Sequence, residues 1–410
     1  MIRRTGLRHA LLALAIMAVA SSLSASPISL QALVDAAEIN AILTLEPGVY
    51  SGPVLIEKSL TIEGRGKATI DSGGRGSVVV IKADGVTLKG LRLTNSGESH
   101  NDIDSGVQVR GRFNVIKDNV IDNTLFGIDL QQSENNIVRR NHISSKDVDL
   151  GLRGDAIRLW YSFNNKITDN IIRDSRDMVV WYSADNLIAR NQSSGGRYSL
   201  HFMYSNTNEI IDNRFVGNAV GIFVMYSQGM VFRNNFIAHA AGATGVGIGF
   251  KESSKLLLEG NRVLYCATGL YLDVSPHEPD TTNVFRDNVL GFNGIGVRFL
   301  SDWKGNEFLG NTFKGNLTQV VAGSGGSAAR NVWQGNFWDD YEGFDRDRNG
   351  IGDAPYELYA YADRVWMDVP PTQFFQGAPV LEMLDFMERL APFSAPRLML
   401  RDSEPRMVVN

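Results

Sequence analysis

The chain has 410 residues, with 40 Lys and Arg against 45 Asp and Glu, which gives a net charge of −5 at pH 7. No basic block interrupts this balance, so nucleic acid is not an expected partner. A single cysteine, Cys266, excludes an internal disulfide framework and is expected to pack as a small apolar residue, although a role as a thiol ligand stays open.

The first 26 residues have the features of a secretory signal peptide. Arg3, Arg4 and Arg8 precede a short apolar run that ends near Leu23, and small residues follow up to Ser26. The run is too short for a confident membrane span. Residues 1–26 are therefore predicted to direct export, by a route that the sequence leaves open.

Residues 27–93 are expected to form an N-terminal cap and the first coils of a repeat array. The stretch SLQALVDAAEI predicts an amphipathic helix, which would cover the open end of a stack of strands. LTLEPGVY, VLIEKSLTIEG and VTLKGLRLTN are typical of strands.

Residues 94–338 contain an internal repeat with the pattern N-x-x-x-x-N, as in NVIKDN from Asn114 to Asn119. Ten copies can be aligned, of which two keep only the second position, Asn235 and Asn261. The second asparagines are spaced by 22, 29, 21, 22, 22, 26, 27, 23 and 25 residues. This period indicates a repeat array.

The repeats predict an all-β fold, a right-handed parallel β-helix. Each one carries short apolar strands followed by Asn or Gly, without helical periodicity. A strand this short buries its apolar side only when coils stack along an axis. Asparagine is expected at the corner because it tolerates left-handed backbone angles and because stacked carboxamides form hydrogen-bonded ladders.

One column of outward side chains contains unusual residues. In the strand LHFMYS, Leu200 and Phe202 should point inward, while His201 and Met203 point outward. Two positions before the serine that ends each strand of this set, successive coils carry Gln131, Trp160, Trp181, Met203, Met225, Lys251 and Asp273. We call this column the methionine stripe.

His201, Met203 and Met225 are predicted to converge with Trp181 beside them. Two thioethers and an imidazole suit Cu(I), because thioethers need no deprotonation before they bind the ion. The tryptophan would shield the ion or contact it through its ring face. Two other interpretations stay open: a docking patch for a partner protein, and coverage by the inserted loop SSKDVDLGLRG.

Residues 339–410 are expected to form a separate C-terminal module. Its acidic loop DRDRNGIGD places Asp345, Asp347, Asn349, the Ile351 carbonyl and Asp353 at the spacing of a Ca²⁺ loop, with Tyr356 where a bidentate glutamate would stand. An acidic turn without metal is the alternative.

The segment PVLEMLDFMERLAPF predicts an amphipathic helix in this module. It places Val380, Leu381, Leu384, Met387 and Leu390 on one face. The helix would either cap the last coil or contact a partner.

The chain resembles the NosD family in four features. These are the signal peptide, the asparagine repeats, the strands that end in MYS, and the module FWDDYEGFDRDRNGIGDAPYELYAYADRVWMDVP. The resemblance covers essentially the whole mature chain, and the C-terminal module is its most specific part. It implies a periplasmic protein, not an enzyme, that delivers copper and possibly sulfur for the copper centres of nitrous oxide reductase.

The same resemblance implies three partners: an ABC transporter made of permease and ATPase, a copper-chaperone lipoprotein, and the apoprotein of nitrous oxide reductase. Contact with the membrane would occur only through the transporter. The chain lacks G-x-x-x-x-G-K-[ST], so any energy from ATP must come from a partner.

Two rival functions remain. One is a carbohydrate-active β-helix enzyme, such as a uronate lyase or epimerase, for which Arg153, Asp155, Arg158 and the loop around His277 are the candidate residues. The other is a metal-free structural adaptor.

Overall fold

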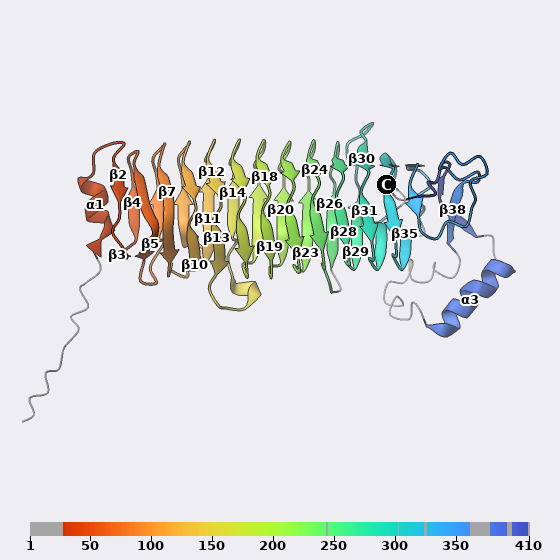
Figure 1. Cartoon of the computed structure of the whole chain (residues 1–410), viewed down its shortest axis with the longest axis horizontal. Coiled ribbons are helices and arrows are strands. Elements are labelled where there is room, and N and C mark those ends of the chain that lie inside the picture. Colours follow the sequence, from red (N-terminus) through yellow and green to blue (C-terminus); the bar gives the residue numbers. More distant parts are fainter. Residues whose placement is uncertain are drawn as a thin grey trace, which may run out of the picture.

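The structure, a computed structural model, describes residues 28–242, 245–301, 303–323, 326–360, 378–391 and 396–408. The predicted signal peptide lies outside these ranges. The chain winds into a parallel β-helix whose coils stack along one long axis, as predicted (Figure 1). Within the described ranges, no helix has the length and apolar character needed to cross a membrane.

One face of the rod is a sheet of 12 parallel strands in the described chain, one from each successive coil. We call it the 12-stranded sheet. Its strands are β4 (Val54–Ile56), β6 (Val79–Ile81), β8 (Ser105–Val109), β11 (Phe126–Gln131), β14 (Ile157–Trp160), β17 (Asp177–Trp181), β20 (Tyr198–Met203), β23 (Val220–Met225), β26 (Val246–Lys251), β29 (Thr268–Asp273), β32 (Ile295–Phe299) and β35 (Thr318–Ala322).

The remaining coil strands form a second sheet, which contains two parallel ladders joined at the N-terminal end. The junction is the long strand β5, which pairs with β2 through its first residues and with β3 through its last. The strands are β1 (Ile28–Ser29), β2 (Ile42–Thr44), β3 (Gly48–Ser51), β5 (Thr61–Asp71), β7 (Thr87–Thr94), β9 (Val115–Lys117), β10 (Val120–Thr124), β12 (Ile137–Arg139), β13 (His142–Ser145), β15 (Lys166–Thr168), β16 (Ile171–Arg173), β18 (Leu187–Ala189), β19 (Gln192–Ser194), β21 (Glu209–Ile211), β22 (Arg214–Val216), β24 (Val231–Arg233), β25 (Phe236–Ala238), β27 (Leu257–Glu259), β28 (Arg262–Leu264), β30 (Asn283–Arg286), β31 (Val289–Gly291), β33 (Asn306–Leu309), β34 (Thr312–Lys314), β36 (Val332–Gln334) and β37 (Phe337–Trp338).

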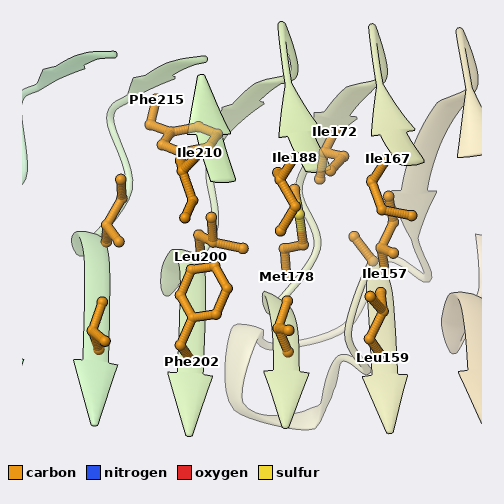
Figure 2. Close-up of a cluster of buried hydrophobic side chains, with 14 of the residues drawn as sticks. Ile157, Leu159, Ile167, Ile172, Met178, Ile188, Leu200, Phe202, Ile210 and Phe215 are labelled. Carbon is orange, nitrogen blue, oxygen red and sulfur yellow. The ribbon is translucent and has the colours of Figure 1, made fainter. Parts of the chain in front are cut away.

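The core is a continuous apolar column inside the coils. Figure 2 shows how Ile, Leu, Met and Phe side chains from successive strands point toward one another across the interior. Leu200 and Phe202 are fully buried in this column, so the predicted direction of the side chains of β20 is confirmed. Because each coil covers the apolar side of the next one, strands of three residues are long enough to form a stable core.

The second asparagines of the repeat form a buried ladder along the rod. Asn191 represents it: its Nδ2 donates to the Ile167 carbonyl at 2.8 Å and to Asn213 Oδ1 at 3.0 Å, and its Oδ1 accepts from the backbone and side chain of Asn170. The predicted hydrogen-bonded ladder is thus confirmed. At Met230 and Leu256, which replace the first asparagine of the pattern, the neighbouring column becomes apolar.

The expected left-handed backbone of these asparagines is wrong. In this corner the left-handed conformation belongs to the preceding residue, for example Asp118, Asp169 and Arg190, with φ of 58°, 59° and 55°. The asparagine occupies its position because its carboxamide both donates and accepts hydrogen bonds, which satisfies buried backbone groups in two coils.

The two ends of the rod are covered by different elements. At the N-terminal end, α1 (Leu30–Ala36) buries Leu30 and Val34 and contacts the first coil through Gln31, as expected for the cap. At the C-terminal end, the antiparallel strands β38 (Tyr356–Ala360) and β39 (Arg397–Asp402) pack on the last coil. The buried carboxylate of Asp402 accepts from Asn336 and ends the asparagine ladder.

The helix α3 (Pro379–Leu390) lies away from the rod in Figure 1. Among its described side chains, Val380, Met383, Phe386, Met387 and Leu390 are all exposed, by 43% to 71%. These five side chains of α3 therefore do not pack on the last coil, and the side chains of Leu381 and Leu384 of the predicted face lie outside the described residues. The strands β38 and β39 cover the last coil instead.

Candidate functional site

The methionine stripe lies on the outer face of the 12-stranded sheet, in the register that the sequence predicts. Trp160 pairs with Trp181, Trp181 with Met203, Met203 with Met225, and Met225 with Lys251. His201 occupies the neighbouring outward column, between Val179 and Phe223.

The structure brings His201 and Met225 together. The Nε2 atom of His201 lies 3.5 Å from the Sδ atom of Met225 on the next strand. On the other side, the indole of Trp181 meets the imidazole edge to face, with ring centroids 5.8 Å apart. Met203 lies between Trp181 and Met225 in the strand register, so the predicted residues share one patch of β17, β20 and β23.

The separation of nitrogen and sulfur fits a shared metal ion. Zinc serves as the reference for bond lengths, with ~2.0 Å to imidazole nitrogen and ~2.3 Å to cysteine sulfur. Two donors 3.5 Å apart then subtend an angle of about 109° at the ion, which is close to tetrahedral. The donor set of imidazole and thioether suits a soft monovalent ion such as Cu(I).

Two polar atoms of this patch are buried without a hydrogen-bond partner in the described part of the chain: Nδ1 of His201 and Nε1 of Trp181. Buried polar atoms are normally paired, so an orphaned imidazole nitrogen needs an explanation. Burial lowers the pKa of His201 below its ordinary value; Asp177 opposes the shift and Arg197 adds to it. The imidazole is therefore held neutral, which is the form that binds metals.

The surroundings of His201 include groups that sequence reasoning missed. Tyr198 stacks on the imidazole with centroids 5.0 Å apart, and the guanidinium of Arg197 lies over the ring of Tyr198. Arg197 in turn pairs with the buried carboxylate of Asp177. These contacts fix the ring of His201, so that its nitrogen atoms have a defined direction.

A ladder of stacked tyrosines runs beside the stripe. Tyr161, Tyr182, Tyr204 and Tyr226 follow one another with centroids 4.8 to 5.2 Å apart and nearly parallel rings. The repeated triplets WYS, WYS, MYS and MYS are the sequence signal that would have predicted it. Because the ring faces stack on each other, mainly ring edges and hydroxyl groups remain for contact with a ligand or partner.

The inserted loop after β13 does not take its polar contacts from the patch. It contains the short 3₁₀ helix η1 (Leu150–Leu152), and the Leu152 carbonyl lies 3.1 Å from His100 Nε2 of an earlier coil. Arg153 bonds to the Val148 and Asp174 carbonyls. Trp181, His201, Met203 and Met225 all stay partly exposed.

Cys266 has no features of a ligand. It is buried in the core, its Sγ lies 3.4 Å from the Leu264 carbonyl, and burial raises the pKa of the thiol to about 11. A thiol with so high a pKa stays protonated at neutral pH. The packing role expected from the sequence agrees with this position.

The acidic loop of the C-terminal module folds around its own backbone. Asp345 accepts from the amides of Asn349 and Gly350, and Asp353 accepts from the amide of Arg346. Throughout the described ranges, no three His, Cys, Asp or Glu side chains form a group able to hold a metal. The calcium site with Asp345, Asp347, Asn349, Ile351 and Asp353 stays a prediction.

The residues proposed for a rival enzyme site do not form one cluster. Arg158 pairs with Asp129 at 2.8 Å, whereas Asp155 pairs with Arg176 at 2.9 Å. His277 is exposed at the rim of a depression of about 390 Å³, and its neighbour Glu278 pairs with Lys255 at 2.9 Å. An acid and a base facing each other across a groove are not seen among these residues.

Solved structures similar to the chain show the same fold. They include the A-module of the mannuronan C-5 epimerase AlgE6 of Azotobacter vinelandii, 14% identical with a TM-score of 0.55, which covers 74% of this chain and 93% of that one. The family 28 exopolygalacturonase of Yersinia enterocolitica is 11% identical with a TM-score of 0.51, over 72% of this chain and 75% of that one. At these identities the likeness establishes the β-helix alone.

Relatives identified by sequence indicate the family of this chain more specifically than the solved structures do. Proteins named "Probable ABC transporter binding protein NosD" match at 27% identity in Pseudomonas aeruginosa (89% of this chain, 87% of the relative) and at 26% in Stutzerimonas stutzeri (88% and 86%). The family described as "Periplasmic copper-binding protein (NosD)" matches residues 140–343, which include every residue of the candidate copper patch. With relatives aligned over most of both chains, the chain belongs to the NosD family.

Proposed function

We propose that this protein carries copper in the periplasm and delivers it, with an ABC transporter, for assembly of the copper centres of nitrous oxide reductase. The observation that carries the proposal is the pairing of His201 Nε2 with Met225 Sδ at 3.5 Å, beside Met203 and Trp181. The description of the family as copper-binding supports it.

The patch has the properties that a carrier needs. Its donors are neutral, so an ion can bind and leave without the gain or loss of a proton at neutral pH. It lies on an open sheet surface, so a partner can reach the ion directly. The arrangement favours binding and transfer over catalysis, because the described residues place no general acid and general base on either side of the candidate ligands.

The test is an anaerobic competition titration of Cu(I) between the mature protein and a chromophoric chelator. His201→Ala, Met203→Leu and Met225→Leu should each weaken binding of one equivalent by ~100-fold or more, because loss of even an outer-sphere partner costs 10 to 100-fold. Leucine keeps the volume of methionine, so the fold should be unchanged.

Met178→Leu is the matched control, because Met178 belongs to β17 but points into the core, where it is 2% exposed. It should bind Cu(I) like the wild type. If the wild type binds Cu(I) and the stripe variants retain its affinity, copper is held elsewhere and the patch is a docking surface. If the wild type binds no Cu(I), the protein is a metal-free adaptor.

The transporter contact is proposed for α3. Its exposed residues Val380, Met383, Met387 and Leu390 recur at the three- and four-residue spacing of one helical face, which fits an apolar groove on a partner. The relatives are named as transporter-binding proteins, which supports a partner of this class. A copper-chaperone lipoprotein and the reductase apoprotein are the proposed donor and recipient.

A further inference from the structure

The methionine stripe ends at a positive charge. Lys251 of β26 is in direct register with Met225 of β23, one strand spacing away, ~4.8 Å. The next member of the column is Asp273 of β29. Thus the column changes from the neutral thioether of Met225 to the ammonium group of Lys251 between two adjacent strands.

Lys251 is turned toward the patch side of the column. Its Nζ lies over the ring of Tyr226 at 5.7 Å from the centroid, and Tyr226 directly follows Met225 in the chain. Among the described residues Lys251 forms no ion pair within 4 Å, although Asp273 and Glu252 act on it at longer range. The hydrogen bond to Tyr226 raises the pKa of Lys251 above its ordinary value.

Within the described chain, Lys251 is the charged residue in direct strand register with a candidate ligand. On the opposite side, the guanidinium of Arg197 is neutralised by the carboxylate of Asp177, and Trp181 and Trp160 are uncharged. In this column the charge nearest to an ion held between His201 and Met225 is therefore positive, and the negative charge of Asp273 lies one strand farther away. The repulsion from Lys251 is proportional to the charge of the ion, so the energy for a divalent ion is twice that for a monovalent one.

We propose that Lys251 makes the patch selective for a monovalent soft ion, Cu(I), over divalent ions such as Cu(II), and that it weakens the hold on Cu(I) enough for transfer. This inference rests on the proposed function, because it concerns the same patch. Lys251 is a specificity-determining residue here and is not a ligand.

The test compares Cu(I) and Cu(II) affinities of the wild type, Lys251→Gln and Lys251→Arg, counting only binding that His201→Ala removes. At an effective dielectric between that of a protein surface and that of water, loss of the charge should tighten Cu(I) binding about fivefold and Cu(II) binding about 25-fold. Lys251→Arg should behave like the wild type. The gain should shrink as salt rises, because salt screens exposed charges.

Lys166→Gln serves as the matched control, since Lys166 is an exposed lysine on β15 of the other sheet, and it should change neither affinity. Circular dichroism checks that all variants are folded. If the wild type binds Cu(I) but Lys251→Gln changes the Cu(I) and Cu(II) affinities equally, or changes neither, the role of Lys251 is overturned and the proposed function is not. Absence of Cu(I) binding by the wild type would overturn the proposed function and this inference together.

Discussion

The asparagine ladder and the methionine stripe are both columns built from one residue per coil, but they differ in burial and in whether the residue type repeats. In the ladder the same residue recurs from Asn119 to Asn336, it is buried, and its hydrogen bonds link each coil to the next. In the stripe the residue changes from Gln to Trp to Met to Lys to Asp along the rod. Two buried polar atoms beside it, on His201 and Trp181, have no partner in the described chain.

The difference shows how to separate structure from function in a repeat protein. A column that repeats without change serves every coil equally and is explained by folding. A column that changes over two or three coils confers no uniform stability, and its residues are explained by a local task.

The largest expected effect concerns the ladder. Asn191→Ala removes the two hydrogen bonds that the Asn191 side chain donates and the two that it accepts from Asn170, whose Nδ2 keeps its bond to the Val138 carbonyl. Each buried hydrogen bond contributes ~1 kcal/mol net, so the loss of these four should lower the free energy of unfolding by about 4 kcal/mol. Urea denaturation measures this loss. Gln192→Ala, at the exposed neighbouring position, should cost less than about 0.5 kcal/mol.

A smaller effect is expected from a buried charge near the stripe. Burial raises the pKa of Asp155 to about 6; Arg176 and Arg158 oppose the shift, and Asp177 adds to it. The folded state therefore holds the proton more tightly than the unfolded state, so this group stabilises the fold increasingly as pH falls from above 6 toward 4. Between pH 7.5 and 5 the gain should be about 1 kcal/mol.

The variant Asp155→Asn isolates this contribution, because its side chain does not titrate. The difference in unfolding free energy between the wild type and the variant should grow in favour of the wild type as pH falls from 7.5 to 5. If this difference is constant over the pH range, Asp155 has an ordinary pKa. Burial of its carboxylate beside Arg176 and Arg158 would then not destabilise the folded protein.

The smallest expected effect on stability belongs to the stripe itself. Met203→Leu keeps the volume of a partly exposed side chain, so the free energy of unfolding should change by less than about 1 kcal/mol. Thermal unfolding of the metal-free protein checks this. A large loss would place Met203 with the ladder as a structural residue and would weaken the interpretation of the stripe as a functional column.

Much of this architecture could be predicted from the sequence. The spacing of the asparagines predicts the coils, and alternation in LHFMYS predicts which side chains of β20 point outward, because strand geometry fixes both. The conformation of the corner was wrongly assigned, since a pattern of residues shows where a turn lies but not which residue takes the left-handed angle.

What surrounds His201 depended on tertiary structure. The sequence determined the rod, its buried ladder, and a column in which methionine follows tryptophan, because each follows from a local period repeated along the chain. Only the fold decided that Tyr198 stacks on the imidazole, that His201 and Met225 stand 3.5 Å apart, and that β38 and β39, not α3, cover the last coil. The contacts of His201 depend on side-chain rotamers, and β38 and β39 lie outside the sequence repeats. The spacing of residues along the chain therefore does not predict either of them.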